Sequence, residues 1–490
     1  MPATAPQRTS PSTPHSAHSG TVGAPAGPSR LRWAILVIVL VAEVMDLVDG
    51  TIVNVAAPSI RADLGGSSAT LQWLGAGYTL AFAVLLVTGA RLGDRFGRRR
   101  LFITGIIGFT LASIACASAP SAAVLIAVRV AQGAFGALLI PQGFGVLKEV
   151  FPEEELTKAF AAFGPVMGLS AVAAPVIGGA LVDADLLGSG WRAIFLVNVP
   201  LGVAGLVGAA RLMPRTAGTR GTRLDPVGVA LLTGASVAVI YPLVQGREQG
   251  WPLWCFGLLA LGAALLAGFV LYERAHRASA LIEPSLLRNG AFTSGLLVAV
   301  CFFAAMIGLN LVLSLFCQLG EGYSPLRTGL TIAPFALGVA FTAPVSYPLA
   351  QRFGRVSMQA GFAVMGAGFV LLAVMVAHGG VHVSSWTLVP GEALAGMGMG
   401  LSLPPLFDFI LAGVASHEVG SASGVLNAIQ QLGSALGIAV LATIFFAYLD
   451  AHHTPTHAMT RTTLLSIVPL ALAFAAVWRL PRRPREEPAL

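Results

Sequence analysis

Long apolar runs separated by short polar loops make up most of the sequence after residue 32. A helix needs about 20 mostly apolar residues to cross the hydrocarbon core of a bilayer. On this criterion the pattern predicts fourteen membrane-spanning helices, an even number that places both termini on the same side. The predicted spans are 33–55, 71–90, 101–118, 121–147, 157–182, 191–210, 225–245, 252–273, 292–318, 328–350, 355–377, 384–412, 421–448 and 462–479.

The distribution of Lys and Arg agrees with an even number of spans, which places both termini on the same side. With the N-terminus inside, the inner loops and the two tails hold 23 of the 29 Lys and Arg residues, and the outer loops hold five. Cytoplasmic loops of membrane proteins carry such an excess of Lys and Arg. The sequence therefore predicts a multi-pass protein of the cell membrane with both termini in the cytoplasm.

The composition excludes most soluble classes of protein. Of the 490 residues, 56% are hydrophobic and only 10% are charged, against about 25% charged in soluble domains. The net charge of +7 does not indicate nucleic-acid binding, because the Arg residues lie in short loops beside apolar spans. The four cysteines lie in or next to apolar runs without a C-x-x-C pair, so we interpret them as buried apolar side chains.

A four-residue repeat indicates two related halves. Residues 95–98 and 352–355 both read Arg-Phe-Gly-Arg, and each follows the second helix of a six-helix half if the spans 225–245 and 252–273 are an inserted hairpin. Two homologous bundles around a central site are a common design of secondary transporters. The predicted units are a disordered tail (1–30), an N-terminal bundle (31–212), a linker with the hairpin (213–290), a C-terminal bundle (291–480) and a tail (481–490).

Three acids interrupt the first apolar run. At 100° per residue, Glu43 and Asp46 share a stripe about 80° wide with Asn54, and Asp49 lies at its edge. A carboxylate at the centre of a bilayer costs roughly 3 kcal/mol or more, and three ionised acids on one stripe would repel one another. We expect at least one of them to bind a proton, although a polar network that only holds helices together remains an alternative.

Arg129 is the one basic residue in the middle of a predicted span. It must form an ion pair or face water, and Gln132 shares its helix face together with small residues. Two interpretations overlap. Arg129 is either a structural ion-pair partner of the first helix or a counter-ion whose pairing with Asp46 or Asp49 depends on protonation.

The loop at 89–102 contains five Arg residues around a single acid, Asp94. A basic loop that only sets membrane orientation explains the Arg excess but not Asp94 or Gly97. Glycine allows close approach and tight turning, and Asp94 is able to pair with a nearby Arg such as Arg95 or Arg98, or to cap a helix of the other half. We therefore predict a gating loop that stabilises one end state.

Polar residues are sparse in the spans of the second half. Glu392 and Asp408 lie toward opposite ends of the span 384–412, where each is a candidate for transport or for reaching the membrane interface. Further candidates for lining a cavity are amides, for which hydrogen bonding between helices is an equal alternative. They are Asn54 and Gln132 in the first half, and Asn310, Gln318, Asn427, Gln430 and Gln431 in the second.

The sequence contains no clear motif for metal binding, ATP-driven transport or enzymatic hydrolysis. His452, His453 and His457 are predicted in one external loop without an acid or cysteine that completes a metal site. The pattern G-x-x-x-x-G-K-[ST] of ATP-driven proteins does not occur, and neither a hydrolase triad nor a zinc-protease motif stands out. We expect no enzymatic activity, no cofactor and no metal.

Taken together, several stretches resemble the major facilitator superfamily and its 14-helix drug:proton antiporter branch. The loop at 89–102 resembles the signature loop of the superfamily. Helix motifs of the antiporter branch are similar to LVDGTIVNVAAPSI (47–60), AVRVAQGAFGALLIP (127–141), WRAIFLVNVPLG (191–202) and YSPLRTGLTIAPFALG (323–338). The resemblance covers about 33–448 and identifies Asp49 as the matched acid of the first helix, whereas Asp46 and Glu43 are inferred from the helical wheel alone.

Three positions depart from the family pattern. Ala90 stands where the signature loop usually has Gly, and Ala174 precedes Pro175 where the antiporter motif has Gly. The small side chain keeps close packing, but the motif at 174–179 is weaker evidence for antiport. Gln430 stands where the family often has Arg.

The resemblance and the buried acids together predict an all-α transporter with the major facilitator fold, two six-helix bundles and a two-helix insertion. The predicted activity is export of a hydrophobic or cationic small molecule in exchange for protons, by a monomer in the lipid bilayer. A facilitator or importer of a polar metabolite on the same fold is the alternative. A non-transporting membrane sensor would require a soluble effector domain, which the sequence does not contain.

Overall fold

The computed structural model of the chain describes residues 29–152, 155–156, 158–159, 162–215, 218, 225–275, 284–379, 383–411, 414 and 419–482. The predicted tails lie outside this part of the chain, except for residues 29–30 and 481–482. The described residues form helices joined by short turns, and no strand is assigned among them. The predicted all-α class is confirmed.

The helices of the first half follow the predicted spans. We call this half, which ends at Leu212, the N half. Its helices are α1 (Ser29–Leu64), α2 (Ser68–Phe96), α3 (Arg98–Ala117), α4 (Ala122–Val150), α6 (Phe163–Ala184), the short α7 (Ala193–Leu196) and α8 (Asn198–Leu212).

The hairpin and the second half, which we call the C half, complete the fold. The hairpin consists of α9 (Pro226–Gln245) and α10 (Leu253–Ala275). The C half contains α11 (Pro284–Arg288), α12 (Gly290–Leu315) with a π-helical turn (Phe316–Gly320), α13 (Pro325–Phe353), α14 (Arg355–His378), α15 (Ser385–Leu411), α16 (Val419–Asp450) and α17 (Pro455–Ala476).

The number of spans agrees with the prediction. In the described part of the chain, 13 helices are long and apolar enough to cross a bilayer. Helix α1, with 36 residues, is the fourteenth: it is long enough, but its three acids lower its apolar character. The chain is therefore a multi-pass membrane protein with two six-helix bundles and an inserted hairpin.

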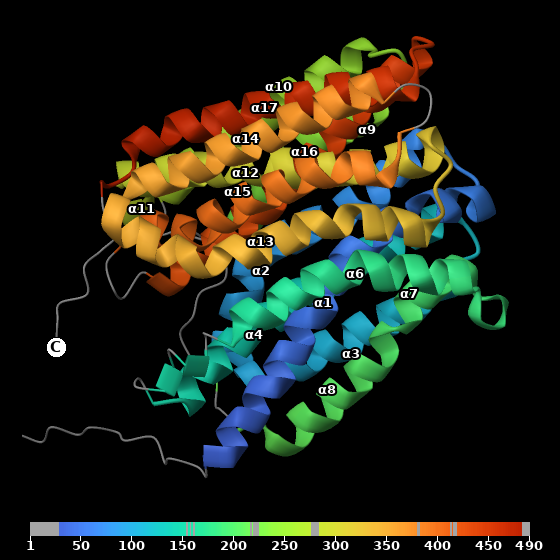
Figure 1. Cartoon of the computed structure of the whole chain (residues 1–490). Helices are drawn as coiled ribbons and strands as arrows, with labels where there is room; N and C mark the ends of the chain where they lie inside the picture. Colours follow the sequence, from blue (N-terminus) through green and yellow to red (C-terminus); the bar gives the residue numbers. More distant parts are fainter. Residues whose placement is uncertain are drawn as a thin grey trace, which may run out of the picture.

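The two halves pack their helices in the same pairwise pattern. In the N half, α4 packs against α2 and α3, and α1 packs against α6 and α8. In the C half, α15 packs against α13 and α14, and α12 packs against α16 and α17. The two bundles lie one above the other in Figure 1, and they meet where α6 contacts α13 and where α2 contacts α16. The repeat at 95–98 and 352–355 joins equivalent helices in the two halves.

Several hydrogen bonds join the halves at the end of the molecule opposite the start of α1 and the end of α17 (Figure 1), which we call the outer end. Ser314 and Gln318 donate to the backbone carbonyls of Asn54 and Val55 at 2.9 and 2.8 Å. The Leu326 amide at the start of α13 donates to Asp183 at the end of α6 at 3.1 Å. In the described part of the chain, the hydrogen bonds between the halves lie at this end, so the structure is closed there.

The inserted hairpin adds to this closure. Helix α9 packs against both α2 and α16, and Thr443 of α16 donates to the Leu243 carbonyl of α9 at 2.8 Å. In the loop after α9, Arg247 binds Ser68 of the N half and Asp450 of the C half. Its neighbour Glu248 accepts from the Ala69 amide at 2.8 Å and so caps α2. The hairpin therefore holds the outer ends of both halves.

Some helix boundaries differ clearly from their predictions. Helix α1 ends at Leu64, nine residues after the predicted end at 55. Helix α17 begins at Pro455, seven residues before the predicted start at 462. Thr454 caps the helix by accepting from the His457 amide, and Pro455 occupies the first helical position. Proline is favoured there because it needs no amide hydrogen bond. His457 therefore lies in a helix and not in a loop.

Candidate functional site

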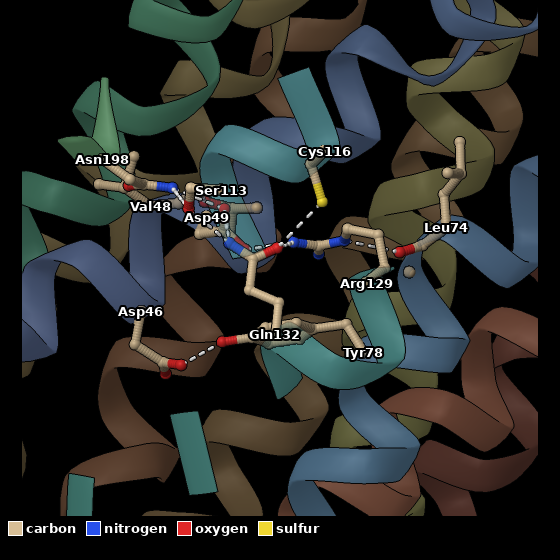
Figure 2. A network of polar contacts seen from close by, with 12 residues as sticks. Asp46, Val48, Asp49, Leu74, Tyr78, Ser113, Cys116, Arg129, Gln132 and Asn198 are labelled. Atoms are coloured by element: carbon tan, nitrogen blue, oxygen red, sulfur yellow. Dashed lines mark hydrogen bonds and ion pairs between the residues drawn. The ribbon is translucent and has the colours of Figure 1, made fainter. Parts of the chain in front are cut away.

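A buried carboxylate at the centre of the N half carries the densest polar network of the described residues. The side chain of Asp49 on α1 has no solvent exposure. One carboxylate oxygen accepts from Gln132 at 3.0 Å and from Asn198 at 2.7 Å. The other forms an ion pair with Arg129. Figure 2 shows that these groups converge from α1, α4 and α8.

The guanidinium of Arg129 is equally enclosed. It is fully buried, and it donates to Gln132 at 2.8 Å and to the backbone carbonyl of Leu74 at 3.2 Å. Its carbon lies 4.4 Å from the centre of the Tyr78 ring, within range of a cation–π contact. A buried charge persists when an opposite charge and hydrogen bonds compensate its desolvation. Asp49 with these contacts supplies that compensation for most of the guanidinium, while Nη2 has no hydrogen-bond partner among the described residues.

Close helix packing makes room for the pair. Gly133 follows Gln132 on α4, and a Cβ atom there would collide with the backbone carbonyl of Tyr78. Only a residue without a side chain lets α4 approach α2 this closely. Ser113 of α3 completes the network by accepting from Gln132 at 2.8 Å. The predicted inward face of Arg129, with small neighbours, is observed.

The other two acids of α1 are placed differently. Asp46 and Glu43 are both partly exposed, in contrast to Asp49. Asp46 accepts a hydrogen bond from the Tyr78 hydroxyl (Figure 2), and one buried carboxylate oxygen of Glu43 has no hydrogen-bond partner among the described residues. The helical wheel placed Asp49 at the edge of the acidic stripe, and here it points into the bundle while the other two acids lie outside the ion pair.

Tyr78 connects Asp46 with the buried Asp49–Arg129 ion pair. Its hydroxyl donates to Asp46, and its ring lies against the Arg129 guanidinium. Protonation of Asp46 would therefore change a hydrogen bond made by the residue that packs on Arg129. The arrangement can transmit a change of charge on the accessible side of α1 to the buried ion pair.

The predicted gating loop is built from contacts within the N half. Asp94 pairs with Arg98 at 2.7 Å, and Arg98 also pairs with Glu149 at the end of α4 at 3.0 Å. Arg95 lies over the ring of Phe96. Gly97 joins α2 to α3 with φ of 95°, a backbone conformation that L side chains rarely adopt. Of the two partners predicted for Asp94, the nearby Arg is the one observed.

The predicted cavity residues occupy four different places. Asn310 and Glu392 line a small cavity inside the C half. Gln132 belongs to the Asp49–Arg129 network, because its amide both donates and accepts there. Gln318 lies at the contact between the halves at the outer end, as does the backbone of Asn54. Partly exposed positions on α16 are occupied by Asn427, Gln430 and Gln431.

The remaining polar candidates lie near the membrane surfaces. Asp408 is exposed toward the inner end of α15. The rings of His453 and His457 stack with centres 4.5 Å apart. Among the described residues no group of three His, Cys, Asp or Glu side chains is placed to hold a metal ion.

Three residues of the network are not distinguished by the sequence pattern: Tyr78, Ser113 and Asn198. Tyrosine and serine are common in membrane helices, so neither pattern nor spacing singles them out. Asn198 lies in the stretch 191–202 that resembles a family motif, and this is the one signal that could have found it. Its amide donates to both Asp49 and Ser113.

Comparisons with known proteins agree with this architecture. The family model of the Major Facilitator Superfamily matches residues 39–438. A probable actinorhodin transporter of Streptomyces coelicolor is 49% identical over 89% of this chain and 76% of its own length. A puromycin resistance protein of Streptomyces alboniger is 36% identical over 92% and 89%. A multidrug resistance protein of Mycobacterium tuberculosis is 33% identical over 84% and 75%.

Solved structures share the fold at low sequence identity. A peptide transporter in an auto-inhibited state matches with a TM-score of 0.67 at 16% identity, over 93% of this chain and 99% of its own. A bacterial homologue of the lysosomal transporter Spinster matches with a TM-score of 0.63 at 17% identity, over 94% and 100%. With two equivalent six-helix bundles and an inserted hairpin, a buried ion pair in the first bundle, and a family match over most of its length, this chain is a member of the major facilitator superfamily of transporters.

Proposed function

We propose that this transporter exports hydrophobic, drug-like small molecules from the cell in exchange for protons. The observation that carries the proposal is the polar centre of the N half, where a fully buried ion pair, Asp49–Arg129, lies next to two partly exposed acids of the same helix. Relatives named for actinorhodin, puromycin, tetracenomycin C and methylenomycin A support an antibiotic or a related compound as the substrate class.

The mechanism starts from the partly exposed acids. Glu43 and Asp46 take up protons and lose their negative charge. Tyr78 contacts both Asp46 and Arg129. The loss of charge at Asp46 therefore changes the electrostatic surroundings of the Arg129 guanidinium. The hold of Arg129 on Asp49 then weakens, and the two halves rock about the central site. Protons bind the two end states with different affinity, and this difference drives the exchange.

The chemistry of the site restricts the substrate. The acids of α1 disfavour anionic groups nearby, and apolar helices favour hydrophobic molecules. The loop around Asp94 and Arg98 favours one end state, and its ion pairs within the N half hold the adjoining ends of α2, α3 and α4 together. The outer end is closed in this structure, a state in which the substrate enters from the cytoplasm.

We further propose that the protein acts as a monomer in the cell membrane with both termini in the cytoplasm. The distribution of Lys and Arg supports this orientation, with 23 of 29 on the inner side. A cysteine introduced into the outer loop at Gln249, which is exposed, should react with a membrane-impermeant maleimide in intact cells. One introduced at Arg215 should react only after the cells are opened.

A susceptibility panel tests the export function. Cells that lack their own efflux pumps should tolerate several-fold more puromycin, tetracenomycin C or methylenomycin A when they express this chain. Asp49→Asn should abolish the protection while the protein remains in the membrane, and the matched control Asp63→Asn, on the same helix but outside the apolar core, should retain it. Full protection by Asp49→Asn would refute the proposed role of Asp49.

Proton movement separates exchange from the alternative, a facilitator or importer of a polar metabolite. Vesicles that contain the purified protein should acidify or alkalise in response to the protective drug, with the direction set by the drug gradient. A drug flux without any pH signal would favour the facilitator. Asp49→Asn vesicles serve as the control for passive leak.

A further inference from the structure

The cavity of the C half is lined by side chains of that half alone. Its walls come from α12, α13, α14 and α15, and it has room for about one water molecule. It is partly open, and it is too small for a drug-sized substrate. Its lining consists of Met306, Leu309, Asn310, Leu313, Phe335, Phe369 and Glu392.

The cavity contains one carboxyl group without a counter-ion. Glu392 is 4% exposed, and the hydrogen bonds and ion pairs of the described residues include none to its side chain. Apart from Asn310, the lining side chains are apolar. A carboxylate in such surroundings costs several kcal/mol more than the neutral acid. The acid therefore needs a proton, because no cation in the described residues compensates its charge.

Nearby titratable groups do not supply that charge. Arg327 at the start of α13 lies over the Tyr323 ring and donates to Ser385 at 3.2 Å. Glu321 accepts from the Val383 amide at 2.9 Å. Cys317, a buried thiol, interacts electrostatically with Glu392. On the packed faces of α14 and α16 the nearest ionisable groups are at the helix ends, His378 and Asp450.

The position of the cavity matches the ion pair of the N half. Helices α4 and α15 are equivalent in packing, and Arg129 and Glu392 are the eighth residues of these helices. Helices α1 and α12 are also equivalent in packing, and Asn310 lines the cavity from α12 as Asp49 lies in the polar network from α1. The C half thus has an acid where the N half has the guanidinium, and an amide where the N half has the carboxylate.

A third pair of positions fits the same correspondence. Tyr78 is the eleventh residue of α2, and Phe335, which lines the cavity, is the eleventh of α13. The aromatic ring is kept and the hydroxyl is absent. The C half has fewer polar groups at this place than the N half, and a water-sized space remains beside Glu392.

We propose that Glu392 and Asn310 form a second proton site, at the place in the C half that the Asp49–Arg129 pair occupies in the N half. The carboxylate binds one proton and becomes a neutral acid, whose hydroxyl donates to the Asn310 carbonyl oxygen or to a water in the cavity. The ionised form requires more water than the cavity holds, so it is favoured when the helices around the cavity move apart. Proton release from this site is thereby tied to the motion of the C half.

The occupancy of the site is testable without any drug. Infrared spectra of the reconstituted protein at pH 7 should contain the carbonyl stretch of a protonated, buried carboxylic acid. Glu392→Gln should remove part of this band, and the control Asp408→Asn, on the same helix, should not. Asn310→Ala should shift the frequency of the band, because the acid loses a hydrogen-bond partner. An unchanged band in folded Glu392→Gln overturns the proposal.

The link to motion needs a second measurement, and it rests on the proposed exchange of protons. Spin labels at Ala62 and Trp386, which are exposed on the outer ends of the two halves, report whether that end opens. The four native cysteines are buried, so labels attach at the introduced sites. The distance distribution of the otherwise unchanged protein should change with pH, and Glu392→Gln should remove one step of that change.

The two failures are distinguishable. If Glu392→Gln loses part of the acid band but keeps the full pH response of the distance, the tie to motion is wrong. If the drug panel shows no protection while the band still depends on Glu392, export of those drugs is wrong and the proton site stands. Glu392→Asp, which keeps the carboxyl group, should restore the band and the response in part.

Discussion

The N half and the C half pack equivalent helices in the same way but fill the equivalent place with different chemistry. In the N half, Asp49 and Arg129 neutralise each other within a dense set of hydrogen bonds. In the C half, Glu392 shares a small cavity with Asn310 and has no opposite charge among the described residues. Two related halves can therefore keep the same helix packing while one has a compensated ion pair at its polar centre and the other has a single acid.

This difference predicts how much stability the protein loses when each polar centre is mutated. Breaking a buried pair leaves an uncompensated charge, which is strongly destabilising. Replacing a lone acid such as Glu392 by a neutral side chain leaves no opposite charge without its partner. The largest effects are therefore expected in the N half, and smaller ones in the C half and at the contacts that both halves share.

The largest effect is expected for Arg129→Ala. Removal of the guanidinium leaves Asp49 buried without its partner, at a cost of about 3–5 kcal/mol. We expect poor accumulation in the membrane, early unfolding in SDS titrations and loss of efflux. Arg129→Lys should be partly tolerated because the charge remains while the planar set of donors is lost. Normal stability and transport of Arg129→Ala would show that the pair is not a compensated unit.

A smaller effect is expected for Arg247→Ala, at a contact that both halves share through the hairpin. This side chain binds Ser68 and Asp450 and lies over Phe446. Because Asp450 is mostly exposed, the ion pair itself contributes at most about 1 kcal/mol. We expect wider distances between labels at Ala62 and Trp386, with normal accumulation. Arg461→Ala, in α17 and away from this contact, is the control, and identical distances in both variants would exclude a role for the hairpin in closing the outer end.

A still smaller change in stability is expected for Glu392→Gln. The substitution keeps the shape of the side chain and removes no compensated charge, so the free energy of unfolding should change by less than about 1 kcal/mol. SDS titrations of this variant and Arg129→Ala, at matched positions, compare the two halves directly. A loss as large as that of Arg129→Ala would mean that Glu392 has a partner of its own.

The smallest effect concerns the pH dependence of the outer contact. Burial opposes the charge of Glu248, but the hydrogen bonds from the Ala69 amide and from Ser67 and Ser68, with Arg247 nearby, hold its pKa below the usual value. A lowered pKa means that the contact stabilises closure at neutral pH and is lost as the pH falls through that lowered value. Glu248 is an exposed residue, so the effect should stay below about 1 kcal/mol. Distances between the same labels at pH 7 and at acidic pH, compared with Glu248→Gln, measure it.

Much of the fold was predictable because a bilayer restricts what a chain can do. Every backbone polar group in hydrocarbon must be satisfied within a helix, so the length of each apolar run and the loop charges suffice for the number and orientation of the spans. Acids and an Arg inside such runs are costly. The amino-acid order alone therefore marks Glu43, Asp46, Asp49 and Arg129 as candidate functional residues.

The local pattern along one helix was less informative about contacts between helices. A helical wheel placed three acids on one stripe, but only packing shows that Asp49 points into the bundle while Asp46 binds Tyr78. The positions of Asn198 and Ser113 beside Asp49 depend on α3 and α8, which come from distant parts of the chain. The role of the hairpin, whose loop holds Ser68 and Asp450 together, has no sign in the sequence.

Span number, orientation and the presence of charge in the membrane thus follow from composition and order of residues, since solvation by lipid acts on each segment separately. Which charges meet, which remains alone and where a cavity is left depend on how the helices pack against one another. These are properties of side chains brought together from separate segments, and the matched places of Arg129 and Glu392 are visible only when the two bundles are compared in three dimensions.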